Sequence, residues 1–119
     1  MRRYLLVLAA LAVCVPARAA GLDAAFNNTI ISTYPDGRTA ELWLNPDGTY
    51  NAEGRRHDRS SGRWFMKGEK VCLRQSRPIP VPFKFCTPMM RGGVGATWSA
   101  KAVTGEPIRI RLVAGRSRA

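Results

Sequence analysis

Apolar and polar residues alternate along most of this chain, in short runs separated by turn residues. Alternation places successive side chains on opposite faces of an extended strand. The clearest run lies near the end of the chain, where Ile108, Ile110 and Leu112 alternate with two arginines. We predict strands over residues 29–34, 39–44, 49–53, 62–67, 70–75, 83–87, 97–103 and 108–112.

Turn residues separate these runs at regular intervals. Pro35-Asp36-Gly37 and Pro46-Asp47-Gly48 place proline where φ near −65° is needed and glycine where a positive φ is needed. Consecutive hairpins spaced by about 8 to 12 residues predict an all-β fold, a small antiparallel up-and-down β-barrel of seven or eight short strands. Ahead of the first strand, one helical turn within residues 21–28 could close one end of the barrel with Leu22, Ala25 and Phe26.

The first 19 residues have the features of a secretory signal peptide. Met1-Arg2-Arg3 precedes an apolar run from Tyr4 to Val15, and Ala17-Arg18-Ala19 offers small residues two apart. The run of about a dozen residues is too short to cross a bilayer, which needs about 20. We expect cleavage after Ala19, a periplasmic or secreted domain of residues 20–119, and no transmembrane segment in it. In an alternative interpretation, Cys14 is lipidated and retained.

Cleavage after Ala19 would leave two cysteines, Cys72 and Cys86. Export into an oxidising compartment makes their pairing the default, so we predict one disulfide. Closing a loop of about 15 residues would stabilise the fold by about 3 kcal/mol, which matters because a domain of this size has a modest core. The alternative, a reactive or metal-binding pair, needs a reducing compartment or further ligands.

The chain is basic, with 19 Lys and Arg against 8 Asp and Glu. Three of the arginines belong to the predicted signal peptide, so residues 20–119 carry a net charge of about +8. For an exported protein, this charge favours lipid head groups, lipopolysaccharide phosphates, cell-wall polymers or an acidic protein as partners over nucleic acid. A solvated basic surface explains the same charge without any partner.

The densest basic segment is the predicted loop from Arg55 to Arg59. Guanidinium groups there could donate bidentate hydrogen bonds to phosphate or carboxylate. An arginine on the following strand would extend the patch, and an exposed Phe65 or Trp43 would add stacking. The candidate binding residues are Arg55, Arg56, His57, Arg59 and Arg63.

The sequence contains no arrangement that predicts an enzyme. His57 is the only histidine, and in an extended chain it points away from the adjacent Asp58, so a serine triad is not indicated. Met89 and Met90 together with His57 could be imagined as soft ligands for copper. Methionines that follow a proline more often fill gaps in a core. We therefore predict no catalytic residue, no metal and no cofactor.

Several motifs resemble those of small secreted bacterial proteins of lipocalin-like type. They are Asp47-Gly48-Thr49-Tyr50, Ser61-Gly62-Arg63-Trp64, Gly68 followed by Cys72 and later Cys86, and Gly95-Ala96-Thr97-Trp98. The resemblance covers residues 34–98. It implies a compact β-barrel in the bacterial envelope, and it implies no reaction and no functional residue.

These observations favour an exported, monomeric, non-catalytic binding module that recognises an anionic envelope component through the 55–59 loop. Two alternatives stay open. The proline-containing segment Ser76–Pro82 could inhibit an exported enzyme. An apolar cavity in the barrel could carry a small molecule, unless the barrel is filled by its own side chains.

Overall fold

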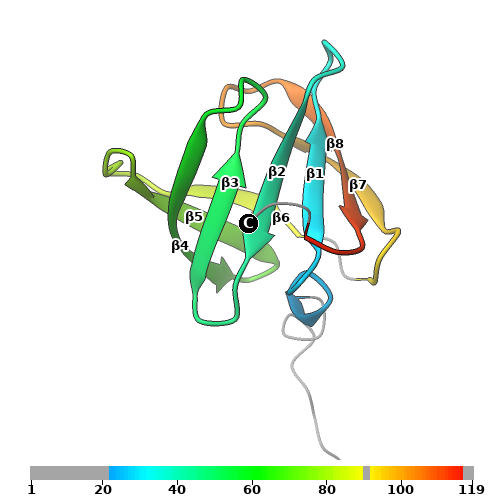
Figure 1. Ribbon diagram of the computed structural model, residues 1–119, viewed down its shortest axis with the longest axis horizontal. Helices are drawn as coiled ribbons and strands as arrows, with labels where there is room; N and C mark the ends of the chain where they lie inside the picture. The colour runs from blue at the N-terminus through cyan, green and yellow to red at the C-terminus, as the bar shows by residue number, and fades with distance from the viewer. Residues whose placement is uncertain (1–21, 90–91, 117–119) are drawn as a thin grey trace, which may run out of the picture.

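Eight antiparallel strands form a single sheet in the computed structural model of the chain (Figure 1), which describes residues 22–89 and 92–116. The predicted signal peptide and Cys14 lie outside these residues, as does Met90. The strands are β1 (Thr29–Thr33), β2 (Thr39–Leu44), β3 (Thr49–Glu53), β4 (Arg59–Lys67), β5 (Lys70–Arg77), β6 (Phe85–Pro88), β7 (Thr97–Lys101) and β8 (Pro107–Val113).

The sheet curls into a nearly closed up-and-down barrel. Each strand from β1 to β5 pairs with the next one in sequence, β7 pairs with β8, and β8 pairs with β1. Among the described residues, β6 and β7 lie next to each other without a hydrogen-bonded ladder. We call this unpaired junction the seam. The predicted fold class is confirmed, and the seam is the one place where the barrel is not closed by main-chain pairing in the described part.

All the predicted strands are present, but several ends differ: β5 runs on to Arg77, β6 begins at Phe85 instead of residue 83, and β7 ends at Lys101 instead of residue 103. The largest difference is at β4. We expected residues 54–61 to form a polar loop, but β4 begins at Arg59, because Ser60 pairs with Ala52 and Arg59 pairs with Glu53. Small polar residues carry little strand signal in a sequence. A register shift between Ser61 and Gly62 marks a bulge in β4.

The core lies inside the barrel, where the alternating apolar residues meet. Ile30, Leu44, Tyr50, Val71, Trp98, Ile108, Ile110 and Leu112 are buried there. One end is closed by the turn that follows residue 21, where Leu22 and Ala25 are buried and the ring of Phe26 lies 6.0 Å from that of Trp64. This plug confirms the role predicted for the segment before β1.

Trp43 corrects one expectation. It lies on the outer face of β2, opposite Leu42 and Leu44, but only 1% of it is exposed, so it offers no stacking surface. Its indole Nε1 donates to Thr29 Oγ1 at 3.0 Å, and this hydroxyl donates to the Gly115 carbonyl at 2.6 Å. Arg116 donates to Asn45 Oδ1 at 2.8 Å. Gly115 and Arg116 are therefore attached to the barrel by these hydrogen bonds.

The predicted disulfide is present. Cys72 of β5 and Cys86 of β6 are directly opposite in the ladder, with Cα atoms 3.9 Å apart. Cys72 lies on the face opposite Val71 and Leu73, as alternation predicts, and it is fully buried. The bond therefore joins the short strand β6 to β5, the one strand of the described residues with which it forms a ladder, since the other edge of β6 faces the seam.

Candidate functional site

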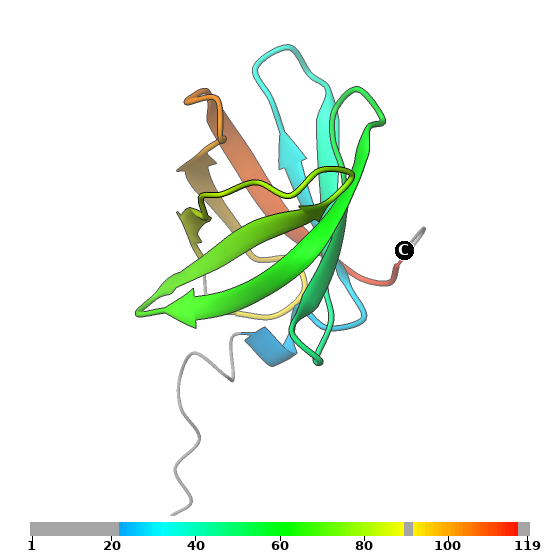
Figure 2. The same ribbon diagram turned by 90° about the vertical axis from the view of Figure 1, so that its left-hand side faces the viewer.

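Four loops gather at the end of the barrel opposite the Leu22–Phe26 plug. They connect β1 to β2 (residues 34–38), β3 to β4 (54–58), β5 to β6 (78–84) and β7 to β8 (102–106). The ladders place them at one end, because Thr33 pairs with Thr39, Glu53 with Arg59, and Lys101 with Pro107. We call this end the mouth. In Figure 2 three of these loops form the upper rim, and the segment before β6 crosses the front of the barrel.

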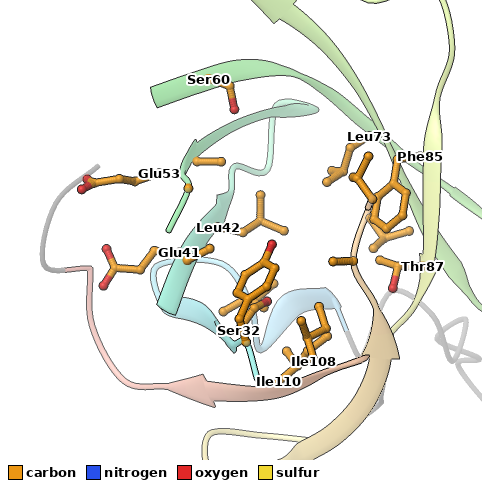
Figure 3. Close-up of a pocket in the computed structure, with 18 of the residues that line it drawn as sticks. Ser32, Glu41, Leu42, Glu53, Ser60, Leu73, Phe85, Thr87, Ile108 and Ile110 are labelled. Carbon is orange, nitrogen blue, oxygen red and sulfur yellow. The ribbon is translucent and has the colours of Figure 1, made fainter. Parts of the chain in front are cut away.

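A cavity of about 260 Å³ lies inside the barrel and reaches the mouth. Its apolar lining includes Ile30, Leu42, Ala52, Val71, Leu73, Phe85, Met89, Ala102, Ile108 and Ile110. Figure 3 shows Leu73 and Phe85 on one side of the open space, with Leu42, Ile108 and Ile110 facing them. The barrel is therefore not filled by its own side chains, which was one of the outcomes left open.

Polar groups are few in the lining and lie mainly toward the mouth. Tyr34, Asp58 and Ser60 belong to that end, and Thr87 lies on β6 beside the seam. Glu41 and Glu53 also border the cavity, but Figure 3 shows their side chains pointing away from the labelled apolar residues. An apolar chamber with a few hydrogen-bonding groups is typical of small-molecule sites.

Arg55 connects three loops of the mouth. Its guanidinium donates to both carboxylate oxygens of Glu106 at 2.9 and 3.1 Å and lies 3.4 Å from Asp36 Oδ2. The guanidinium carbon is also 4.1 Å from the centre of the Tyr34 ring, a cation–π distance. Arg55 was predicted to bind an external anion. In the structure, it already pairs with two carboxylates of its own chain.

The electrostatics of this cluster follow from these contacts. Burial raises the pKa of Tyr34 above its ordinary value of 10.0, and the nearby Arg55 charge opposes this effect. The hydrogen bond from Thr104 Oγ1, at 2.7 Å, and the Arg55 contact lower the pKa of Glu106. The carboxylate is therefore ionised at neutral pH and holds the 54–58 and 102–106 loops together across the mouth.

A second set of contacts holds the base of the 54–58 loop. Glu53 lies on the outer face of β3, with His57 Nδ1 at 3.0 Å and Arg59 Nη2 at 3.4 Å from its carboxylate oxygens. His57 has a positive φ of 68°, a conformation that costs a residue with a Cβ about 1 kcal/mol or more. The contact with Glu53 offsets part of this cost, so His57 has a structural role in the loop that does not require a ligand.

The five predicted binding residues do not form one patch. Arg56 is exposed and makes no ion pair with any described residue, whereas Arg55, His57 and Arg59 are paired with carboxylates. Arg63 lies on the outer face of β4, opposite Thr49, toward the closed end. A charge run in sequence therefore overstates the positive charge available at the mouth.

The residues that shape the mouth were not singled out in the sequence. Tyr34, Asp36 and Glu106 meet Arg55 from positions 19 to 51 residues away. No spacing rule links such positions. Alternation did place Leu42, Ile108 and Ile110 on inward faces, which is the signal that could have located the cavity wall.

No family model, no curated protein and no solved structure matches the chain. The architecture is thus shown by the structure itself, without a family assignment. Within residues 22–89 and 92–116, no group of three or more His, Cys, Asp or Glu side chains could hold a metal ion. In the same ranges, no helix is long and apolar enough to span a bilayer.

Proposed function

We propose that this protein is a non-catalytic carrier of a small, mainly apolar molecule that it binds inside the barrel. The observation that supports this function is the cavity of about 260 Å³, walled by aliphatic and aromatic side chains and bordered by hydroxyl groups. Small-molecule sites usually measure about 300 to 1,000 Å³, so the ligand is small. The lipocalin-like motifs are consistent with this proposal.

The volume limits the size of the ligand. At about 30 Å³ for a water-sized group, the cavity holds roughly nine such groups. An unbranched chain of about this many carbons fits the aliphatic walls, and a hydroxyl or similar polar end would meet Tyr34 and Ser60 toward the mouth. Binding would come mainly from the removal of apolar surface from water.

A homologous series of straight-chain alcohols tests the proposal. We expect affinity to rise about fourfold with each added methylene, since burial of one is worth about 0.8 kcal/mol, and to level off once the chain exceeds the cavity. Dissociation constants would be measured by the thermal shift of the folded protein. Affinity that does not depend on chain length would contradict an internal apolar site.

Three variants test the location and the size of the site. Ala52→Phe places a ring into the cavity and should abolish alcohol binding, whereas Thr33→Phe adds the same ring at an exposed position on β1 and should leave binding unchanged. Leu42→Ala enlarges the cavity and should move the levelling-off to longer alcohols. If both phenylalanine variants bind like the parent protein, the ligand does not occupy the barrel.

The two other hypotheses remain predictions. Recognition of an anionic envelope component through the 55–59 loop would rest mainly on Arg56, because its neighbours are paired. Inhibition of an exported enzyme would use the 76–82 segment, which is held by hydrogen bonds from Gln75 Nε2 to the Ile79 carbonyl and from the Val81 amide to the Gln75 carbonyl.

A further inference from the structure

Three of the large hydrophobic side chains exposed at the surface belong to loops of the mouth. Ile79 is 67% exposed, Phe83 is 61% exposed and Val103 is 65% exposed. Ile79 and Phe83 belong to the loop before β6, and Val103 belongs to the loop after β7. Two of the hydrogen bonds that Gln75 makes hold the first of these loops, so Ile79 stands on a fixed main chain.

The topology places Phe83 and Val103 on the two sides of the seam. β6 begins about halfway along β5, because its first residue pairs with Leu73, and its last residue pairs with Lys70 at the closed end, so the start of β6 is the end nearer the mouth. β7 runs the other way and ends at the mouth. In Figure 2 the segment before β6 ends beside β7, and the two strands are in contact.

Positive charge accompanies these apolar side chains. Lys84 precedes β6 directly and Lys101 is the last residue of β7; both are exposed. Neither lysine makes an ion pair with a described residue. The mouth loops carry the carboxylates Asp36, Asp58 and Glu106. Arg55 pairs with Asp36 and Glu106, and none of the three makes an ion pair with either lysine among the described residues.

The cavity runs along the same seam. Phe85, Thr87 and Met89 from the β6 side and Ala102 from the β7 side belong to its wall, and Val103 borders it. Of the exposed apolar side chains, Val103 borders the cavity itself, and Phe83 lies two residues before Phe85 of the cavity wall, on the other side of the seam. Exposed apolar groups flanked by basic residues are the composition of a surface that docks at a lipid interface.

We propose that the mouth end of the seam docks on an anionic lipid surface, with Phe83, Val103 and Ile79 entering the head-group region and Lys84 and Lys101 contacting lipid phosphates. Charge complementarity identifies an anionic lipid surface as the occupant, because the apolar side chains suit its hydrophobic part and the two lysines beside them suit its phosphates. Docking does not require an occupied cavity, so it stands independently of the carrier function. It would let an apolar ligand exchange between lipid and barrel without crossing water.

Co-sedimentation of the protein with lipid vesicles tests the proposal, using phosphatidylcholine vesicles with and without phosphatidylglycerol. We expect binding to the anionic vesicles and at least tenfold weaker binding to the neutral ones. Each lysine near an anionic surface contributes about fivefold in affinity, so K84Q/K101Q should bind about 25-fold more weakly. The matched control, K67Q/K70Q, removes the same charge at the closed end and should change binding less than threefold.

The apolar contribution needs its own pair of variants. F83S/V103S should lose at least tenfold in vesicle affinity, whereas F65S, at an outer position of β4 that is 40% exposed, should not. A thermal unfolding curve of each variant checks that it is folded. Because all the substituted side chains are exposed, the variants should unfold at temperatures close to that of the parent protein.

Three outcomes would overturn the proposal. One is the absence of binding to anionic vesicles. Another is an equal loss in the two lysine variants, which would mean that net charge alone attracts the protein. The third is a loss for K84Q/K101Q without a loss for F83S/V103S, together with equally tight binding to soluble polyglutamate. That result would assign the lysines to an acidic protein partner instead of a membrane.

Discussion

Reduction of the Cys72–Cys86 disulfide should weaken the barrel at its seam. β6 has four residues and, within the described part of the chain, it pairs with β5 alone and has no ladder on the seam side. The disulfide joins these two strands directly. A reduced protein would hold β6 by one short ladder, while Phe85 and Thr87 of that strand form part of the cavity wall.

The magnitude follows from the loop that the bond closes. The two cysteines are 14 residues apart, and a closed loop of about 15 residues restricts the unfolded chain by about 3 kcal/mol at 25 °C. With a urea m-value of about 1.5 kcal/mol/M, the midpoint of unfolding should fall by about 2 M. The m-value should also fall if β6 separates before the rest of the barrel unfolds.

Urea unfolding followed by tryptophan fluorescence, with and without reductant, measures this loss. The variant C72A/C86A serves as the control, because it should match the reduced protein and show no response to reductant. Alcohol binding should weaken both in the reduced protein and in C72A/C86A. A midpoint that moves by less than about 0.5 M on complete reduction would refute the argument that the loop entropy and the attachment of β6 stabilise this fold.

Three further predictions concern single positions. A Cβ on Gly62 would overlap the Arg74 carbonyl, so Gly62→Ala should lower the unfolding free energy by about 2 kcal/mol or more in urea titrations, and an unchanged value would contradict the bulge geometry. Thr29→Val leaves the buried indole N–H of Trp43 without its acceptor and should cost about 1 to 3 kcal/mol; the same substitution in a Trp43→Phe background should cost less, and equal costs would rule out the bond. The pKa of Glu106 is lowered in the fold, so the stability that it adds is present above its ordinary value of 4.5 and is lost as the pH falls through the lower folded value. Protonation of Glu106 breaks its ion pair with Arg55, so alcohol should enter and leave the cavity faster over that acidic range in the parent protein, and should do so fast at every pH in Glu106→Gln. An exchange rate in the parent protein that does not depend on pH would show that this ion pair does not limit access to the cavity.

The strands and their faces could be predicted from local sequence. Alternation between apolar and polar residues defines an inward and an outward face wherever it is strong, as at Ile108 and Ile110, and proline and glycine pairs mark the turns between strands. The disulfide followed from a count of cysteines under the assumption of export. These features are local or compositional, so each could be found without knowing which strands meet.

The candidate binding loop was predicted less well, because charge counts ignore distant partners. The run from Arg55 to Arg59 reads as a cationic patch in sequence, but Asp36 and Glu106 neutralise Arg55 from loops that only the barrel brings together. Trp43 was considered as an exposed stacking surface, but it is buried on the outer face of β2, because alternation shows on which face a side chain lies and not which residues cover it. Whether a side chain on the outer face is buried depends on contacts with residues far away in the sequence, which the local alternation of apolar and polar residues does not reveal.

The sequence by itself determined the fold class, the strands, the inward-facing residues and the pair of cysteines, because these depend on backbone periodicity, turn chemistry and composition. Only the tertiary structure decided that the barrel keeps a cavity, that its junction between β6 and β7 is unpaired, and that Arg55 is held across the mouth. Those properties arise from how side chains of distant strands fill or leave space and compete for the same charge. They depend on contacts between residues far apart in the sequence, so no local sequence pattern predicts them.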